Sequence, residues 1–244
     1  MHYFRSDVST CQSKQIFAWL ALVGLFGLVA SAHAQSFCSS DGQPRPAALL
    51  ERFVNADCEA CWRDPATPAA GHRQAALDWV IPGSRGDDAP LSPVASRDGF
   101  QRLQALGLPV PSASVASTHA VTGLKGASLR VAHGLALGGY IGVSIELKPA
   151  NNRAAQQPLT AWLALVESIP EGTEGTPVSR NLIRNVLQLN WNGISLLSKE
   201  KRTSFAETRV MSVTAGVNAN NLQVIGWVED SKGTVLAAAQ SRCK

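Results

Sequence analysis

Several features that would assign a function at once are missing from the sequence. Beyond residue 34 no apolar run approaches the ~20 residues that a membrane-spanning helix needs. There is no cluster of basic residues, and the few aromatic residues are not interleaved with Lys or Arg, although 22 basic against 18 acidic residues give a net charge of +4. Such a mild charge bears on solubility rather than on nucleic acid. We therefore expect neither a nucleic-acid partner nor a membrane span in the mature chain.

Motifs of nucleophilic catalysis are also missing. No Gly-x-Ser-x-Gly sequence occurs, and His72, His119 and His133 have no evident Ser or Asp partners. The acidic pair Asp87 and Asp88 stands between Gly86 and Pro90, where solvated turn residues are common. The sequence therefore does not predict a hydrolase.

The N-terminus has the pattern of a secretory signal. Lys14 precedes an uncharged apolar run from Ile16 to Ala30, and Ser31-Ala32-His33-Ala34 supplies the small residues that a signal peptidase requires. The alternative, an uncleaved anchor, needs a longer run. We predict that residues 1–34 are a signal peptide cleaved after Ala34, and that the mature protein is periplasmic or secreted.

Four cysteines remain after this cleavage, namely Cys38, Cys58, Cys61 and Cys243. An even number in an exported protein indicates disulfides, and four cysteines allow three pairings. Cys58 and Cys61 form a Cys-x-x-Cys motif, whereas Cys38 and Cys243 lie near the two ends of the mature chain. We favour the pairing 58–61 with 38–243, the second as a structural disulfide.

The two halves of the chain differ in their patterns. In the first half, residues 47–54 and 74–81 are apolar runs, and residues 98–106 have helical spacing. From residue 124 onward, short strand-like runs dominate, with turn signals at Asn192-Gly193 and at 230–233. Residues 178–186 look helical. We expect an antiparallel all-β, sandwich-like domain over residues 124–244, after a mixed α/β segment.

The Cys-x-x-Cys motif follows a strand and a short loop and precedes a short predicted helix, which is the arrangement of a thioredoxin-type redox site. In that arrangement Cys58 is the nucleophile, and Cys61 resolves the mixed disulfide. The alternative is a structural Cys58–Cys61 disulfide. Asp57 and Glu59 flank Cys58, and like charge disfavours a thiolate, with Arg63 as the nearby cation. The sequence therefore leaves two interpretations of Cys58 and Cys61 open, a redox-active pair and a structural disulfide.

Zinc is a further use of such a pair. Cys58, Cys61 and His72 offer three ligands but no evident fourth, and an oxidising compartment favours disulfides. We predict no metal and no cofactor.

The order of motifs resembles a family of predicted secreted, thioredoxin-like proteins of unassigned function. The similarity is carried by LLERFVNADCEACW, ALDWV, GDDAPLS, PVPSASV, SRNLIRNVLQ and WVEDSKGTVLAAA. It implies a thioredoxin-like α/β domain over residues 35–123, with Pro111 as a cis-proline facing the cysteines. The family has Pro where this chain has Trp62, and the usual closing helix is missing after residue 123, so the domain is a trimmed one.

Two functions follow as hypotheses. The first is an exported thiol–disulfide oxidoreductase or redox-linked module whose partners are protein thiols or disulfides, with Cys58 and Cys61 as the catalytic residues. The second is a non-enzymatic exported binding or assembly protein that keeps 58–61 as a fixed structural disulfide and binds an unknown exported protein.

Overall fold

Strands are the main regular secondary structure of the described chain. A computed structural model describes residues 38–123, 126–150, 158–191 and 204–243, and within them the strands form two sheets of five and seven strands. Among these residues no helix has the length and apolar character needed to cross a membrane. The predicted signal peptide and the turn at Asn192-Gly193 lie outside the described residues.

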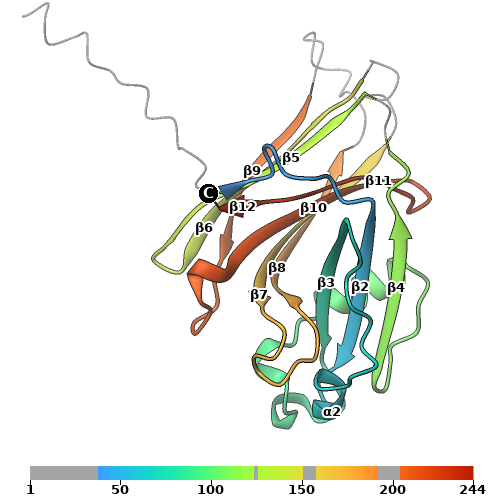
Figure 1. The fold of residues 1–244 in the computed structure, drawn as a ribbon, viewed down its shortest axis with the longest axis vertical. Coiled ribbons are helices and arrows are strands. Elements are labelled where there is room, and N and C mark those ends of the chain that lie inside the picture. Colours follow the sequence, from blue (N-terminus) through green and yellow to red (C-terminus); the bar gives the residue numbers. More distant parts are fainter. Residues whose placement is uncertain (1–37, 124–125, 151–157, 192–203, 244) are drawn as a thin grey trace, which may run out of the picture. The chain divides into compact units, whose positions relative to one another are not determined.

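The five-stranded sheet is antiparallel throughout. In order across the sheet, its strands are β12 (Arg242–Cys243), β1 (Cys38–Ser39), β5 (Ser128–Leu137), β6 (Tyr140–Lys148) and β9 (Phe205–Ser212). The first and last described strands are therefore neighbours, as Figure 1 shows near the C-terminus.

The seven-stranded sheet is mixed. In order across the sheet, its strands are β11 (Val235–Gln240), β10 (Leu222–Asp230), β7 (Leu159–Ile169), β8 (Arg180–Trp191), β3 (Gln74–Ile81), β2 (Ala48–Asn55) and β4 (Ser114–Ala120). β2 and β3 are parallel, β3 meets β8 in parallel at Asp78 and Leu182, and the other pairs are antiparallel. In Figure 1, β2, β3 and β4 stand side by side beside β8.

The main core lies between the two sheets. Alternate residues of β5 and β6, such as Val131 and Ile145, point inward against alternate residues of β7 and β10, such as Leu163 and Val224. This period of two is the pattern of a strand with one buried face. Gly226 on β10 is required here, because a Cβ would stand 2.5 Å from Val131 Cγ1.

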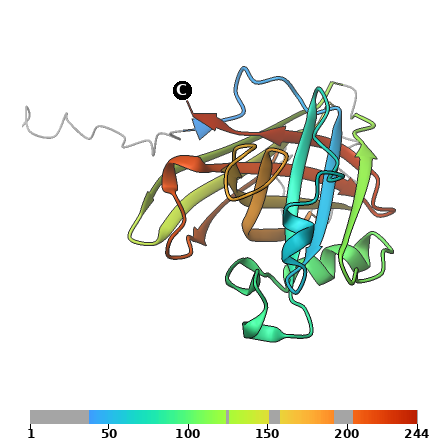
Figure 2. The ribbon, with the colours of Figure 1, turned by 60° about the horizontal axis from the view of Figure 1, so that its bottom comes forward.

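A second core covers the opposite face of the seven-stranded sheet. Its members come from β2, β3, β7 and β10 and from α3 (Asp98–Ala105), which packs against β3. Figure 2 shows α3 beside the strands, and the loop before it holds two 3₁₀ segments, η1 (Gly86–Asp88) and η2 (Ser92–Val94), where Leu91 and Val94 pack with Trp62. Because both faces of β7 and β10 are covered, these strands are buried almost throughout.

An ion cluster is buried within this second core. Arg102 of α3 contacts Glu51 of β2 at 2.6 Å and Glu229 of β10 at 2.7 Å, and all three side chains are nearly inaccessible. Its guanidinium lies 5.2 Å from the Trp162 ring and 5.3 Å from the Trp227 ring. The indole N–H groups of those tryptophans donate to Glu229. The cluster thus joins the helix to two distant strands.

The prediction of a thioredoxin-like α/β domain is wrong. The described chain is nearly all β, with two sheets and only short helices. Strands β2, β3 and β4 do not form a separate sheet, because β3 pairs with β8 and the sheet continues through β7, β10 and β11.

The helix expected over residues 178–186 is also wrong, because this segment is the first half of β8. The spacing of Val178, Leu182 and Val186 suits a helix, but β8 pairs with β7 over eleven residue pairs, from Ile169↔Arg180 to Leu159↔Trp191. Sheet pairing of this length overrides local propensity. By contrast, the hairpin expected at residues 230–233 is present between β10 and β11, with Gly233 at φ +77°.

Candidate functional site

Cys58 and Cys61 lie on a turn at the end of β2. They are joined by a disulfide with a Cα–Cα distance of 5.4 Å, and α2 (Glu59–Trp62) begins between them. Asn55, the last residue of β2, fixes this turn, since its side-chain amide donates to Pro111 O at 3.0 Å and its backbone N–H to Ala113 O at 2.8 Å. Cys58 is half-buried, whereas Cys61 is buried. An incoming thiol can therefore reach Cys58 more readily than Cys61.

The acidic residues that flank Cys58 are occupied by other partners. The Asp57 carboxylate accepts hydrogen bonds from Ser84 N at 2.7 Å, Ser84 Oγ at 2.8 Å and Arg85 N at 3.2 Å. Desolvation alone would raise the pKa of Asp57, but these hydrogen bonds and the charge of Arg85 outweigh it, so the pKa is lowered. Glu59 forms an exposed ion pair with Arg63 at 2.9 Å. Both negative charges are thus partly compensated.

A second charged cluster is buried on the face of the seven-stranded sheet that carries α2. Asp78 of β3 lies between Arg52 of β2, at 2.7 Å, and Arg180 of β8, at 2.9 Å, and none of the three side chains is more than 2% exposed. Two guanidinium groups and one carboxylate leave one positive charge in excess, because Arg stays protonated in proteins. Burial lowers the pKa of Arg180, and the charge of Asp78 opposes this effect.

Arg180 connects this cluster to the cysteine turn. Its Nη2 donates to Trp62 O at 2.9 Å, and its guanidinium lies 4.3 Å from the centre of the Trp62 ring. The Trp62 indole N–H in turn donates to Glu174 O at 3.1 Å, in the loop between β7 and β8. Trp62, which stands where the resembled family has Pro, is therefore clamped between β8 and that loop.

Two cavities flank the turn. One of about 170 Å³ is lined by Cys61, the two buried arginines, Asp64 and the first residues of β4, so Cys61 shares a cavity with charged groups of both signs. The other, a groove of about 300 Å³, has apolar walls and a charged rim. Its lining residues include Trp62, Leu91, Val94 and Leu182, with Glu59, Arg63 and Arg184 at the rim.

Other residues singled out in the sequence lie apart from this chemistry. The peptide bond before Pro111 is trans, since no cis bond occurs in the described residues, and this corrects the expected cis-proline. Its carbonyl nevertheless contacts Asn55 beside the cysteines. His72 is exposed and does not join Cys58 and Cys61 in a ligand cluster, and Asp87 and Asp88 are exposed in η1.

Cys38 and Cys243 form the second disulfide, with a Cα–Cα distance of 4.1 Å. This is the pairing favoured from the sequence. Within the five-stranded sheet Cys38 stands opposite Cys243 on one side and opposite His133 of β5 on the other. His133 is only 4% exposed; burial lowers its pKa, and the hydrogen bond to Gly134 O opposes that effect.

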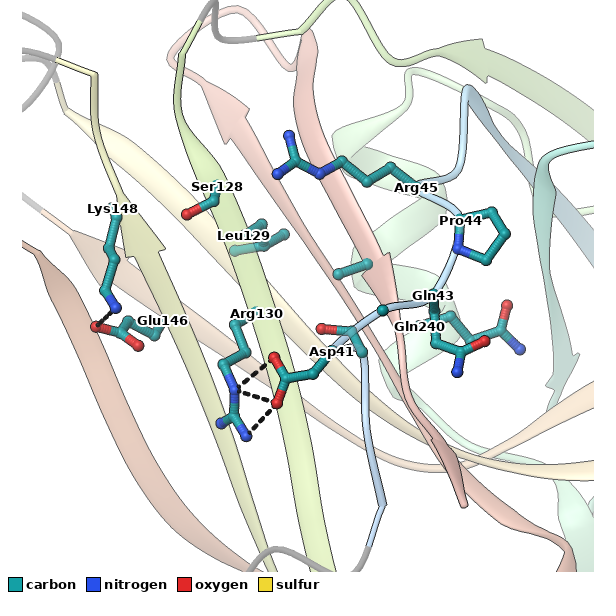
Figure 3. Close-up of a pocket in the computed structure, with 13 residues that line it drawn as sticks. Asp41, Gln43, Pro44, Arg45, Ser128, Leu129, Arg130, Glu146, Lys148 and Gln240 are labelled. Atoms are coloured by element: carbon teal, nitrogen blue, oxygen red, sulfur yellow. Dashed lines mark hydrogen bonds and ion pairs between the residues drawn. The ribbon is translucent and has the colours of Figure 1, made fainter. Parts of the chain in front are cut away.

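A larger cavity, about 470 Å³, is a polar hollow between the segment that follows β1 and strands β5 and β6. Figure 3 shows two ion pairs among its charged side chains, while Arg45 stands apart from both. Arg130 contacts Asp41 at 2.8 Å, and Lys148 contacts Glu146 at 3.5 Å. No cysteine lines it, so size alone does not identify the reacting site.

The buried arginines behind Cys61 were missed in the sequence, although a signal for part of the cluster is present. Arg52 and Asp78 are charged residues inside otherwise apolar strands, in ALLERFVN and QAALDWVI. A charge in such a position is expected to be paired. Arg180 could not be found in this way, because its segment was assigned to a helix.

Comparison with known proteins adds little to this picture. No family model and no curated protein matches the chain. Among solved structures it is similar to HBP35 of Porphyromonas gingivalis, with 13% identity and a TM-score of 0.48 over 80% of this chain and 74% of that chain. It is also similar to chicken MD-1 complexed with lipid IVa, with 10% identity and a TM-score of 0.21 over 50% and 93%. Likeness at this level assigns no function.

Proposed function

We propose that this protein is an exported thiol–disulfide exchange protein in which Cys58 and Cys61 are the reacting pair. One observation carries the proposal: a half-buried Cys58 is bonded to a buried Cys61 that faces a cavity lined by Arg52 and Arg180. A purely structural disulfide needs neither the difference in exposure nor the positive charge.

The positive charge has a defined chemical role. A thiol leaves a disulfide as a thiolate, and a more stable thiolate leaves faster. The cluster of Arg52, Asp78 and Arg180 has one positive charge in excess, in a region where water screens it poorly. In the proposed exchange these guanidinium groups stabilise the Cys61 thiolate that forms when Cys58 is attacked, against the opposing charge of Asp64 in the same cavity.

The exchange balances without a cofactor. A thiolate of the partner attacks Cys58 Sγ, the Cys58–Cys61 bond breaks, and a mixed disulfide forms while Cys61 leaves as a thiolate. A second thiolate of the partner then attacks the partner's sulfur atom in the mixed disulfide and releases Cys58 as a thiolate. Two electrons pass from the partner to Cys58 and Cys61, and the partner gains a disulfide. The reverse sequence transfers the disulfide in the other direction.

The compartment is part of the same proposal. Two disulfides within one chain suit an oxidising environment. With the signal-like residues 1–34, they support a mature protein that works in the periplasm or outside the cell, where protein thiols and disulfides are available as partners.

The test is equilibration of the folded protein in buffers of reduced and oxidised glutathione, followed by acid quenching, alkylation and peptide mapping. We expect Cys58 and Cys61 to be alkylated at milder ratios than Cys38 and Cys243, which serve as the control within the same molecule. A Cys61→Ser variant should accumulate a mixed disulfide at Cys58, and a Cys58→Ser variant should accumulate far less at Cys61.

The alternative is a binding or assembly protein with a fixed 58–61 disulfide. The apolar groove beside Trp62 favours it, because a partner could dock there without any exchange. The same experiment separates the two functions. If the 58–61 bond resists reduction until the protein unfolds, the exchange function is wrong and the fixed disulfide is supported.

A further inference from the structure

We propose that Cys38, Cys243 and His133 form a binding site for a zinc-type metal ion once a dithiol has reduced the bond between the two cysteines. This site belongs to the five-stranded sheet and is independent of Cys58 and Cys61. Soft thiolate ligands with one imidazole are a donor set that suits Zn²⁺.

The sheet register brings the three ligands together. Cys38 on β1 is the direct cross-strand neighbour of Cys243 on β12 and of His133 on β5. The two sulfur atoms and a ring nitrogen of His133 all lie within 4.8 Å of one another. In a tetrahedral site with Zn–S bonds of ~2.3 Å, two sulfur ligands stand about 3.8 Å apart. Once the bond between the two sulfur atoms is broken, side-chain rotations can bring the ligand atoms to these distances around an ion.

His133 is oriented as a ligand. Its Nδ1 lies 2.8 Å from Gly134 O, and because a carbonyl oxygen can only accept, the ring proton of the neutral imidazole is on Nδ1. This leaves the lone pair on Nε2. In the described part of the chain, Nε2 is buried and has no hydrogen-bond partner. A metal ion would satisfy a buried acceptor that otherwise lacks one, and the hydrogen bond at Nδ1 is the support that metal-binding histidines usually have.

The site is also accessible from solvent. Cys38 and His133 are buried, but Cys243 is exposed. An ion can enter from the side of β12, and a water molecule can complete a tetrahedral shell that has three protein ligands.

The chemistry balances as follows. A dithiol supplies two electrons and two protons, becomes a disulfide, and leaves Cys38 and Cys243 as thiols. The metal ion then forms two bonds to sulfur and one to His133 Nε2, and the two thiol protons are released. Binding must therefore weaken as the pH falls.

The experiment uses the mature chain with Cys58→Ser and Cys61→Ser, so that the other cysteines cannot bind metal. The protein is reduced with dithiothreitol, freed of reductant under anaerobic conditions and titrated with Co²⁺. We expect thiolate-to-cobalt charge-transfer absorption that saturates at one equivalent and disappears when Zn²⁺ is added. The oxidised protein should show no such absorption.

Two further variants decide the role of the histidine. His133→Leu should weaken Co²⁺ binding at least tenfold, whereas His72→Leu, which removes an exposed histidine, should leave it unchanged. Circular dichroism of each reduced sample shows whether the sheet persists. Absence of the absorption overturns the proposal, and so does binding of equal strength in His133→Leu, which is also the result that an unfolded chain would give.

Discussion

Asp57 lies next to Cys58, but its carboxylate binds the backbone of a different turn, the one that follows β3. Its carboxylate holds Ser84 and Arg85, and so ties the turn after β3 to the turn after β2. Gly83 makes this contact possible. A Cβ at residue 83 would stand 2.2 Å from the Asp57 carboxylate and 2.5 Å from Asn55 Oδ1.

We therefore expect Gly83→Ala to destabilise the protein by about 1–3 kcal/mol, the usual cost of overpacking. The added methyl group must push away a carboxylate that three hydrogen bonds hold in place. Urea unfolding of the mature protein measures this cost. Gly142→Ala is the matched control, because a Cβ at that position on β6 meets nothing within 4 Å. If Gly83→Ala and Gly142→Ala had the same free energy of unfolding, the turn would accommodate the added methyl group without cost.

Asp57 also makes a prediction about pH. Because its folded pKa lies below the unfolded value, the unfolded chain binds the proton more tightly, and the carboxylate adds stability above the unfolded pKa of ~3.9. That contribution is lost as the pH falls through the folded pKa. Asp57→Asn, which mimics the protonated form, should lower the melting temperature at pH 7, and its difference from the wild type should shrink as the pH falls below the unfolded pKa.

Thermal unfolding followed by circular dichroism between pH 2.5 and pH 8 provides the measurement. Asp88→Asn removes a neighbouring exposed acid and should leave the melting temperature nearly unchanged at every pH. A gap between Asp57→Asn and the wild type that is as large at pH 2.5 as at pH 7 would contradict the assigned role of the charge.

At the scale of elements, α3 depends on one buried side chain. Arg102→Met would leave Glu51 and Glu229 buried without their cation, and breaking a buried ion pair typically costs about 3–5 kcal/mol. We expect a loss of this size in urea unfolding. The control is Arg97→Met, at the exposed start of the same helix. If Arg102→Met lowered the free energy of unfolding by less than about 1 kcal/mol, the core would tolerate Glu51 and Glu229 without the guanidinium group.

The elements differ in how well the sequence predicts them. Strands β2 and β3, helix α3 and the β10–β11 hairpin follow from local patterns, since each is marked by an apolar run, a helical spacing or a turn motif. Strand β8 does not, because its apolar spacing suits a helix and only its partner β7 makes it a strand. The arginines behind Cys61 were missed for the same reason, since Arg180 reaches Asp78 only through the pairing of β8 with β3.

The resemblance to thioredoxin-like proteins misled for a related reason. A strand, a Cys-x-x-Cys turn and a parallel strand are present in β2, α2 and β3. These local features do not determine what lies beyond β3, where the sheet continues through β8 instead of ending as a small domain. Contacts between residues about 100 positions apart leave no mark on a local pattern.

For the molecule as a whole, the Cys38–Cys243 disulfide closes a loop with a sequence separation of 205. On the chain-entropy model its loss costs about 5 kcal/mol, less any strain. We expect Cys38→Ser/Cys243→Ser to lower the melting temperature clearly in calorimetry. Cys58→Ser/Cys61→Ser, which opens a loop with a separation of 3, should cost about 2 kcal/mol on the same model. If Cys58→Ser/Cys61→Ser lowered the melting temperature more than Cys38→Ser/Cys243→Ser, the 38–243 cross-link would not stabilise the protein by restricting the unfolded chain.

Export makes a prediction about the mature N-terminus. Intact mass spectrometry of the exported protein should give a chain that starts at Gln35, with or without cyclisation to pyroglutamate, and with two disulfides. A mass that retains residues 16–30 would refute signal cleavage. The cytoplasmic precursor is the comparison sample.

The nesting of one disulfide inside the other has a consequence for the order in which they form. In the proposed export Cys38 emerges first, then Cys58 and Cys61, and Cys243 last, so oxidation in order of appearance would join Cys38 to Cys58. Closing a loop of 3 residues costs less entropy than closing one of 20, and therefore the 58–61 bond can remove the wrong partner early. Cys38 then waits as a free thiol while about 180 further residues are delivered. A chain that lacks Cys61 should pass through the 38–58 isomer during biogenesis, until Cys243 arrives, forms the 38–243 bond and leaves Cys58 as a free thiol.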